Sequence, residues 1–90
     1  MITRSYRITG YVQGVGYRWF VVRTAKRLDV CGEVRNADDG SVEVVAVGED
    51  HAVERLAEEL ARGPAGARVD RVARLDLADE VPPYTTFTQR

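Results

Sequence analysis

Two segments of the chain carry apolar residues at helical spacing, and each lies between segments in which apolar and polar residues alternate. Alternation predicts strands with one buried face, and helical spacing predicts helices with one apolar stripe. The expected elements are, in chain order, a strand over Tyr6–Val12, a helix over Trp19–Val30, strands over Gly32–Asn36 and Val42–Gly48, a helix capped by Asp50 and stopped by Gly63-Pro64, and strands over Val69–Leu77 and Tyr84–Thr88. This order leaves few ways to bury both stripes.

The simplest fold for this order is an α+β, ferredoxin-like β-α-β-β-α-β sandwich, with a short additional C-terminal strand. It places both helices on one face of an antiparallel sheet. A right-handed crossover makes the first two strands parallel, with the third strand between them and antiparallel to both. Pro82-Pro83 before the last strand suggests that this strand lies at a sheet edge. A chain of 90 residues has room for one core, so residues 1–90 are predicted to form a single domain.

Composition narrows the possible partners. A net charge of −1 and an isoelectric point near 5.8 argue against partners that bind by bulk charge, so we expect no nucleic-acid and no membrane partner. The sequence has no signal-peptide pattern and no apolar run near the roughly 18 residues that span a bilayer. We therefore expect a cytoplasmic protein, with a monomer as the default. The single Cys31 excludes an intrachain disulfide and a cysteine-based metal cluster.

A glycine-rich turn joins the first strand to the first helix and ends in Arg18. Gly14 and Gly16 allow backbone conformations that bring amide N–H groups close to a ligand. A helix start adds partial positive charge and unpaired N–H donors, and Arg18 adds a guanidinium. The turn therefore predicts a phosphate-binding loop, whose candidate residues are Gln13, Gly14, Val15, Gly16, Tyr17 and Arg18.

Asn36 is expected beside this loop. The first two predicted strands are parallel, so their carboxyl ends share one edge of the sheet. Val34 must face the core, and alternation turns Asn36 to the same face. An asparagine amide can orient a water but is a poor general base, so the substrate needs a good leaving group. A mixed carboxylic–phosphoric anhydride has one, and positioning with charge stabilisation then suffices.

With these residues assembled, the chain closely resembles the acylphosphatase family over essentially its whole length. Two family signatures occur in the expected order and on the expected elements. The matching stretches are Gly10 and Val12 to Arg18 with Phe20-Val21 for the first signature, and Gly32 to Asn36 with Asp39 to Glu43 for the second.

The resemblance implies hydrolysis of small acyl phosphates to a carboxylate and inorganic phosphate, without a metal, a cofactor or a covalent intermediate. It implies that Arg18 binds the phosphoryl oxygens, that the amides of residues 14 to 18 complete the cradle, and that Asn36 holds the attacking water. A phosphate oxygen of the substrate would accept the proton of that water. Inorganic phosphate would be product or inhibitor, and catalysis of this kind relies on positioning and electrostatics.

Three positions depart from the family pattern. Tyr17 replaces a common Phe, Asp29 stands where Gly often follows Leu, and Glu33 occupies a place frequently held by Trp. None of these departures removes a proposed catalytic group. Because Glu33 alternates away from Val34, it is expected on the open face of the sheet, and it adds a negative charge within the second signature.

Other chemistry-bearing residues have simpler readings. His51 suggests a base or a phosphoryl acceptor, but it belongs to the start of the second helix, at the end of the sheet opposite the glycine-rich turn. Asp38 and Asp39 suggest magnesium, but adjacent carboxylates before Gly40 are typical of a turn, and no metal is predicted. Cys31 could be a nucleophile, but it lacks an obvious base to activate its thiol. Two aromatic residues, Trp19 and Phe20, are interpreted as packing groups that can also shape an acyl pocket.

Two other functions compete with hydrolysis. In a nucleic-acid-binding module, aromatic residues on the open sheet face would stack on bases. The expected open-face residues make a poor platform for this: Arg7, Thr9, Tyr11, Glu43, Val45 and Val47. An anion-binding module without turnover stays open, because a cradle and an arginine serve binding and catalysis alike. Asn36 favours turnover.

Overall fold

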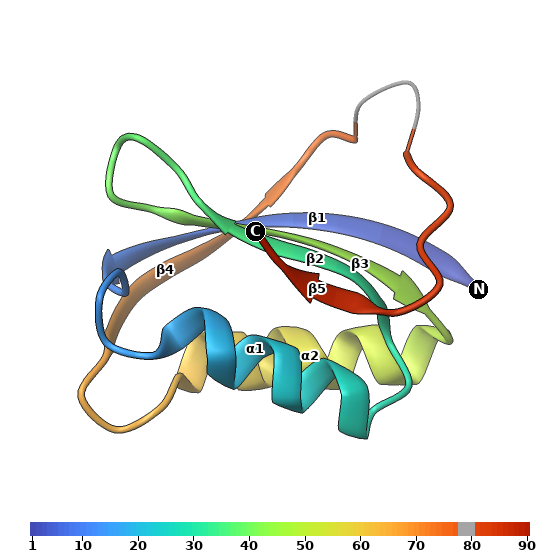
Figure 1. Cartoon of the computed structure of the whole chain (residues 1–90), viewed down its shortest axis with the longest axis horizontal. Helices are drawn as coiled ribbons and strands as arrows, with labels where there is room; N and C mark the ends of the chain where they lie inside the picture. The colour runs from blue at the N-terminus through green and yellow to red at the C-terminus, as the bar shows by residue number, and fades with distance from the viewer. Residues whose placement is uncertain (78–80) are drawn as a thin grey trace.

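The structure, a computed structural model, describes residues 1–77 and 81–90 and contains one sheet with two helices on one of its faces (Figure 1). In the described residues no helix is long and apolar enough to cross a membrane. The elements are β1 (Ile2–Tyr11), α1 (Tyr17–Arg27), β2 (Cys31–Asn36), β3 (Val42–Gly48), α2 (Asp50–Arg62), β4 (Arg68–Leu75) and β5 (Phe87–Gln89). The predicted ferredoxin-like order is confirmed.

The strands follow the spatial order β4-β1-β3-β2-β5. Each neighbouring pair is antiparallel except β2 and β5, which are parallel. Three strands, β1, β2 and β5, therefore run in the same direction and end at one edge of the sheet, where α1 begins (Figure 1). The predicted parallel direction of β1 and β2, with β3 between them, is confirmed, and so is the predicted edge position of the last strand.

The element boundaries differ from the prediction at several ends. β1 begins at Ile2 rather than Tyr6, since Ile2 pairs with Gly48 and extends the ladder beyond the clear alternation. β4 ends at Leu75. The prediction that Asp50 caps α2 is wrong: Glu49 is the N-cap residue, its main-chain oxygen accepts from the N–H of Val53 at 3.0 Å, and Asp50 is already helical.

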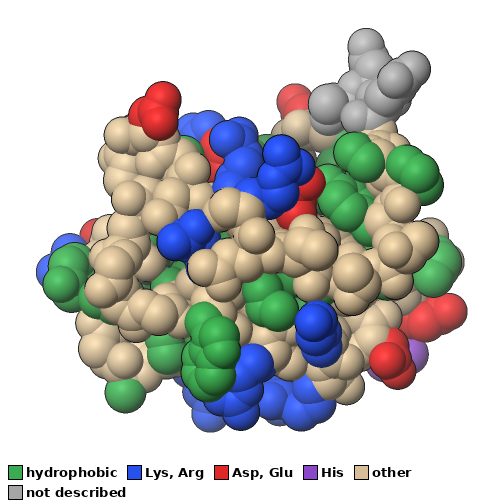
Figure 2. All heavy atoms as spheres, in the orientation of Figure 1, with side chains coloured by type: hydrophobic (Ala, Val, Ile, Leu, Met, Phe, Trp, Pro, Cys, Tyr) green, Lys and Arg blue, Asp and Glu red, His purple; other side chains and the backbone are tan. Residues whose placement is uncertain are grey.

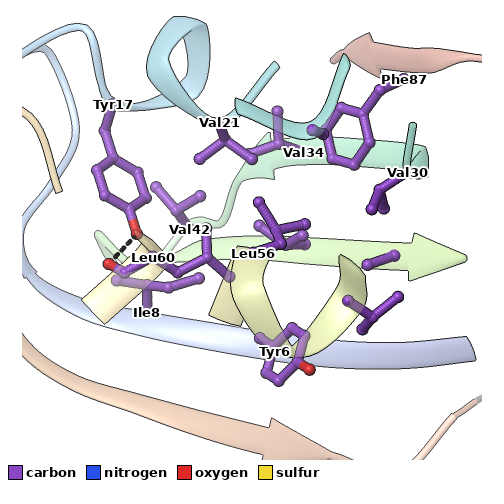
Figure 3. Close-up of a cluster of buried hydrophobic side chains, with 14 of the residues drawn as sticks. Tyr6, Ile8, Tyr17, Val21, Val30, Val34, Val42, Leu56, Leu60 and Phe87 are labelled. Carbon is purple, nitrogen blue, oxygen red and sulfur yellow. Dashed lines mark hydrogen bonds between the residues drawn. The ribbon is translucent and has the colours of Figure 1, made fainter. Parts of the chain in front are cut away.

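The core lies between the sheet and the two helices (Figure 3). Alternate strand residues and the apolar stripes of both helices meet there without solvent exposure, and burial of each aliphatic or aromatic side chain contributes about 1.5–3 kcal/mol. The largest of these fully buried side chains are Tyr17, Phe87, Ile8, Leu56 and Leu60. The core thus holds α1 firmly against the sheet edge where β1 and β2 end.

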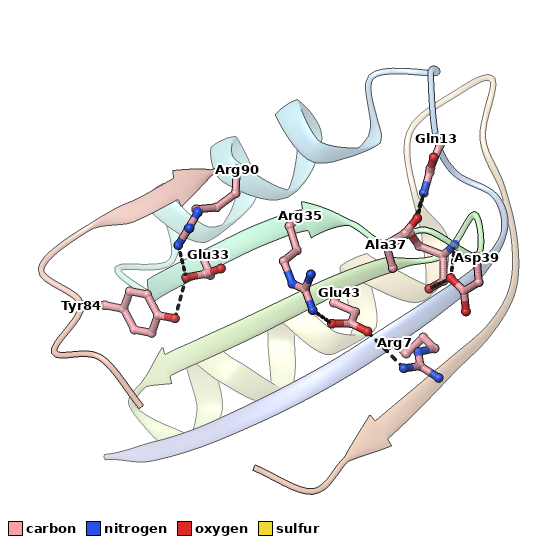
Figure 4. Close-up of polar contacts among 10 residues, drawn as sticks. Arg7, Gln13, Glu33, Arg35, Ala37, Asp39, Glu43, Tyr84 and Arg90 are labelled. Carbon is pink, nitrogen blue, oxygen red and sulfur yellow. Dashed lines mark hydrogen bonds and ion pairs between the residues drawn. The ribbon is translucent and has the colours of Figure 1, made fainter. Parts of the chain in front are cut away.

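Charged residues occupy the opposite face of the sheet. Glu43 of β3 pairs with Arg7 of β1 at 3.1 Å and with Arg35 of β2, and these residues are direct cross-strand neighbours (Figure 4). Glu33 also lies on this face, as predicted, beside Arg35. The face of the sheet opposite the helices, its open face, is therefore a polar surface with ion pairs across neighbouring strands.

Candidate active site

The loop between β1 and α1 has the left-handed backbone that its glycines predict. Gly14 has φ 75° and Gly16 has φ 78°, a region that residues with a Cβ adopt at a cost of roughly 1–2 kcal/mol. Nothing lies within 4 Å of the position that a Cβ would take at either glycine. Backbone conformation, rather than lack of space, is therefore the reason for glycine here.

The positive charge at the start of α1 is not offset by a side chain of its first turn. Gly16 is the N-cap residue and supplies no side-chain cap, and the first turn contains no acidic residue. The first N–H groups of a helix have no partner within the helix, and the helix dipole adds partial positive charge. In most helices a polar side chain or a carboxylate offsets these groups. Here they are free to bind an anion.

The side chain of Gln13 fixes the loop to the β2–β3 hairpin. Its Nε2 donates to the main-chain oxygen of Ala37 at 2.8 Å and to that of Ser41 at 2.9 Å (Figure 4 shows Gln13 directed at Ala37). Both amide hydrogens are thus committed to the hairpin. Within the predicted phosphate-binding set, Gln13 can contribute only its main-chain N–H, while its side chain holds the loop beside the end of β2.

Arg18 lies half-buried in the first turn of α1. Its Nη1 donates to the main-chain oxygen of Arg90 at 2.6 Å, the one hydrogen bond that its guanidinium makes within the described residues. A guanidinium has five N–H donors in a rigid fork, so most of them stay available to an anion. Arg90 follows β5 directly, and therefore Arg18 reaches across to the edge of the sheet.

Asn36 is the last residue of β2, at the same edge of the sheet. Its Oδ1 is buried and has no hydrogen-bond partner within the described residues. A buried amide oxygen that stays unpaired costs about 1–3 kcal/mol, so such atoms usually meet a water or a ligand. The parallel register pairs Val34 with Gln89, which puts Arg90 and Asn36 within one strand step of each other. Arg18 and Asn36 thus lie near the same end of the sheet, although Asn36 is not among the residues that line the pocket at the loop.

A small pocket of about 90 Å³ opens at the loop. Its walls come from the end of β1, the loop, the first turn of α1 and the end of β5: Val12, Gly14, Gly16, Tyr17, Arg18, Trp19 and Gln89. Two larger hollows, of about 370 and 300 Å³, lie elsewhere on the surface, and neither gathers the N–H groups of a helix start. The small pocket is therefore the better candidate for an anion site.

Tyr17 belongs to the site through its backbone and to the core through its side chain. The ring is 1% exposed, and the hydroxyl donates to the main-chain oxygen of Leu60 at 2.7 Å (Figure 3). Burial raises the pKa of this hydroxyl, so it stays protonated and keeps donating. The replacement of the common Phe by Tyr17 thus adds a bond between the start of α1 and the end of α2.

Asp39 and His51 lie where the simpler interpretations put them, whereas Trp19, interpreted as a packing group, is 58% exposed. The carboxylate of Asp39 accepts hydrogen bonds from Oγ of Ser41 at 2.6 Å and from the main-chain N–H of Ser41 at 2.9 Å. These bonds, that of the hydroxyl above all, lower the pKa of the Asp39 carboxyl. His51 is exposed near the start of α2, at the far edge of the sheet. Residues 1–77 and 81–90 contain no cluster of three metal-ligating side chains.

Sequence reasoning missed the part of the site that β5 contributes. Gln89 lines the pocket, and the main-chain oxygen of Arg90 holds Arg18. The run from Tyr84 to Thr88 indicated a strand but did not indicate its partner. Parallel pairing with β2 is the feature that carries both residues to the same end of the sheet as Arg18.

The open sheet face does not favour the nucleic-acid alternative. Tyr11, the expected stacking residue, is 59% exposed, but the neighbouring positions carry the Arg7–Glu43–Arg35 ion pairs. Figure 2 shows basic side chains in separate groups, with acidic side chains between some of them. Base stacking needs several aromatic residues on one platform.

Comparisons with known proteins identify the family and the fold. The acylphosphatase family model matches residues 4–88. An acylphosphatase of Yersinia pseudotuberculosis serotype O:1b is 50% identical over 86 residues, which cover 92% of this chain and 89% of that protein. The acylphosphatase of Pasteurella multocida is 43% identical over 90 residues, covering 100% of this chain and 99% of its own.

A solved structure gives the same result. The crystal structure of acylphosphatase from Bacillus subtilis superimposes with a TM-score of 0.91 at 29% identity, and the match covers 100% of this chain and 99% of that chain. The sequence match over residues 4–88 and the structural match over the whole chain thus point to the same family. The chain belongs to the acylphosphatase family, hydrolases that act on acyl phosphates.

Proposed function

We propose that this site hydrolyses small acyl phosphates by direct attack of a water on phosphorus. The observation that carries the proposal is the buried, unpaired Oδ1 of Asn36 at the same edge as the open start of α1. The phosphoryl oxygens bind the N–H groups of residues 14 to 18 and the guanidinium of Arg18. Charge-assisted bonds of this kind are short and strong, and they position the phosphorus.

Asn36 orients the nucleophile. Its Oδ1 accepts a hydrogen bond from the attacking water, and a phosphate oxygen of the substrate takes the proton of that water. The new bond joins the water oxygen to phosphorus, and the bond from phosphorus to the acyl oxygen breaks. The products are a carboxylate and inorganic phosphate. A carboxylate leaves readily, so the reaction needs no strong protein base and no metal or cofactor.

The acyl group would leave the pocket along Trp19. This side chain lines the pocket, is 58% exposed, and is held by the guanidinium of Arg23, which lies 4.5 Å from its ring centroid. An exposed ring at the mouth can contact a flat or apolar acyl group at little cost.

We also keep the predictions of a monomer and of a cytoplasmic location. A single free Cys31 fits a reducing compartment. Light scattering coupled to size-exclusion chromatography tests the monomer, and fractionation of the source cells tests the location.

The first test measures hydrolysis of benzoyl phosphate in the presence of EDTA. We expect EDTA-resistant turnover by the wild type and a loss of about 100-fold or more in kcat for Asn36→Ala, with inhibition by inorganic phosphate retained. A folded wild type that binds phosphate but does not hydrolyse benzoyl phosphate would instead favour the anion-binding module.

The second test separates Arg18 from the other basic residues of α1. Arg18→Ala is expected to lose both phosphate binding and activity, with kcat/KM lower by about 1000-fold. Arg27→Ala removes an exposed arginine from the last turn of the same helix and is the matched control, so it should behave as wild type. Unchanged phosphate affinity in Arg18→Ala would refute the assignment of the site.

A further inference from the structure

A chain of contacts runs from the open sheet face to Arg18. The main-chain oxygen of Arg90 accepts from Arg18, and the N–H of Arg90 donates to the main-chain oxygen of Val34 at 2.8 Å. The side chain of Arg90 extends to the other face, where its Nη1 lies 3.3 Å from Glu33 Oε1 (Figure 4). One residue therefore touches both the candidate catalytic arginine and a carboxylate that the reaction does not use.

Glu33 is well placed to hold Arg90. Its side chain is only 13% exposed, whereas that of Arg90 is 66% exposed. Glu33 Oε1 also accepts from the Tyr84 hydroxyl at 2.8 Å (Figure 4). Burial, with this carboxylate as the next cause, raises the pKa of Tyr84 to about 12, so the hydroxyl stays a donor. The carboxylate thus joins β2 to the segment before β5 and to the residue after it.

β5 needs such support. It is a three-residue strand at the edge of the sheet, and it pairs with one neighbour only. Two of its residues are exposed, and Phe87 is the one that anchors it in the core. A short edge strand with few ladder bonds is expected to open locally more often than the centre of the sheet. Motion of its end would move the oxygen that Arg18 binds.

We propose that Glu33 is a positioning residue for Arg18: together with Tyr84 it fixes Arg90, whose main-chain oxygen sets the place of the guanidinium. We refer to the three residues Glu33, Tyr84 and Arg90 together as the brace. The inference rests on the proposed function in assigning Arg18 to phosphate binding. It gives a role to Glu33, the departure that adds a charge to the second signature.

The test compares two ion-paired carboxylates on the same sheet face. Glu33→Ala removes the brace, and the matched control Glu43→Ala removes the Arg7 and Arg35 pairs without touching Arg90. Phosphate affinity is measured by calorimetry, and kcat and KM are measured with benzoyl phosphate. We expect Glu33→Ala to weaken phosphate binding and raise KM by about tenfold, because a displaced guanidinium loses its alignment. Glu43→Ala is expected to leave both constants as in wild type.

Two further variants separate positioning from general stability. Glu33→Gln retains an oxygen at the same place and is expected to restore most of the affinity. Tyr84→Phe removes one hydroxyl and keeps the ring, so it is expected to fold and to shift KM in the same direction by a smaller factor. It carries the test if Glu33→Ala does not fold.

The sharpest readout is whether the effects of Glu33→Ala and Arg18→Ala on kcat/KM add up. If Glu33 acts through Arg18, Glu33→Ala lowers kcat/KM in the wild type but has no further effect in Arg18→Ala. A full additional loss in the Arg18→Ala background, or equal effects of Glu33→Ala and Glu43→Ala, would overturn the proposal. A wild type that binds phosphate without turnover contradicts the proposed function alone, because the brace still predicts the difference in phosphate affinity.

Discussion

The two helices of this molecule begin in different ways, at opposite edges of the same sheet. α1 begins after Gly16 in a left-handed conformation and has no acidic residue in its first turn. α2 begins after Glu49 in an extended conformation and has Asp50 in its first turn. Each helix follows a strand, and both helices lie on the same face of the sheet (Figure 1).

The difference shows what turns a helix start into a site. Both starts carry unpaired N–H groups and partial positive charge. Carboxylates of the chain itself offset this charge in α2, whereas α1 has none and adds the guanidinium of Arg18. The ends of β2 and β5 then bring Asn36 and Arg90 to the start of α1 alone. Both helix starts share the dipole, but only the start of α1 combines it with a first turn without acidic residues and with the nearby ends of β2 and β5.

Among the variants that compare the two helix starts, the largest effect is expected from replacing the left-handed glycine that precedes α1. Gly16→Ala is expected to lower kcat/KM by about 100-fold, because the new Cβ disfavours φ 78° and redirects the amides of the cradle. Gly66→Ala is the matched control, since Gly66 has φ 92° and equally open space around its Cβ position. Both variants should lose similar stability in urea, but only the first should lose activity. Equal activity in the two variants would remove the special role of the α1 start.

The next effect follows from giving α1 the acidic first turn that α2 has. Trp19→Glu places a carboxylate beside Arg18 and is expected to weaken phosphate binding by about tenfold. Trp19→Gln has a similar shape without the charge, and it should bind phosphate more tightly than Trp19→Glu. Calorimetry with inorganic phosphate measures both. The same affinity in the two variants would show that charge at this helix start does not govern binding.

The other end of α1 sharpens the comparison, because it also has a left-handed residue. Asp29 has φ 57°, and the N–H of Val30 donates to Ala25 at 2.9 Å, as in a Schellman cap. Asp29→Gly is expected to raise the free energy of unfolding by about 0.5–1 kcal/mol and to leave kcat/KM unchanged. Asp29→Asn keeps the Cβ and removes only the charge, so it should gain less. Lower stability for Asp29→Gly in urea would contradict the account.

The smallest effect is expected at the start of α2. Asp50→Asn removes the favourable interaction of its carboxylate with the helix start, at a cost of about 0.3–0.5 kcal/mol that fades with added salt. Urea denaturation at low and high ionic strength measures this cost. Activity and phosphate affinity should stay at wild-type values, and a change in either would mean that the two helix starts are not independent.

Much of this site follows from local rules. The alternation of Val34 and Asn36, combined with a right-handed crossover, was enough to predict that Asn36 lies beside the loop at the end of β1. The glycines at 14 and 16 predicted the left-handed turn. Each of these inferences needs only the pattern of one or two neighbouring elements.

The contacts that sequence reasoning missed join distant segments. Glu33 and Tyr84 are 51 positions apart, and no local pattern indicates that one will accept from the other. The same holds for Arg18 and Arg90, 72 positions apart, and for the side chain of Gln13, whose bonds to the β2–β3 hairpin the sequence did not indicate. These contacts depend on the parallel pairing of β5 and on side-chain packing, which propensity does not determine.

The most direct test of the central claim is a titration of the ¹⁵N-labelled protein with inorganic phosphate, followed by amide chemical shifts. We predict that the largest shifts occur at residues 14 to 18 and at Asn36, while residues 49 to 52 at the start of α2 do not respond. Largest shifts at α2 or on the open sheet face around Arg7 and Arg35 would contradict the claim, as would no response of the α1 start at saturating phosphate.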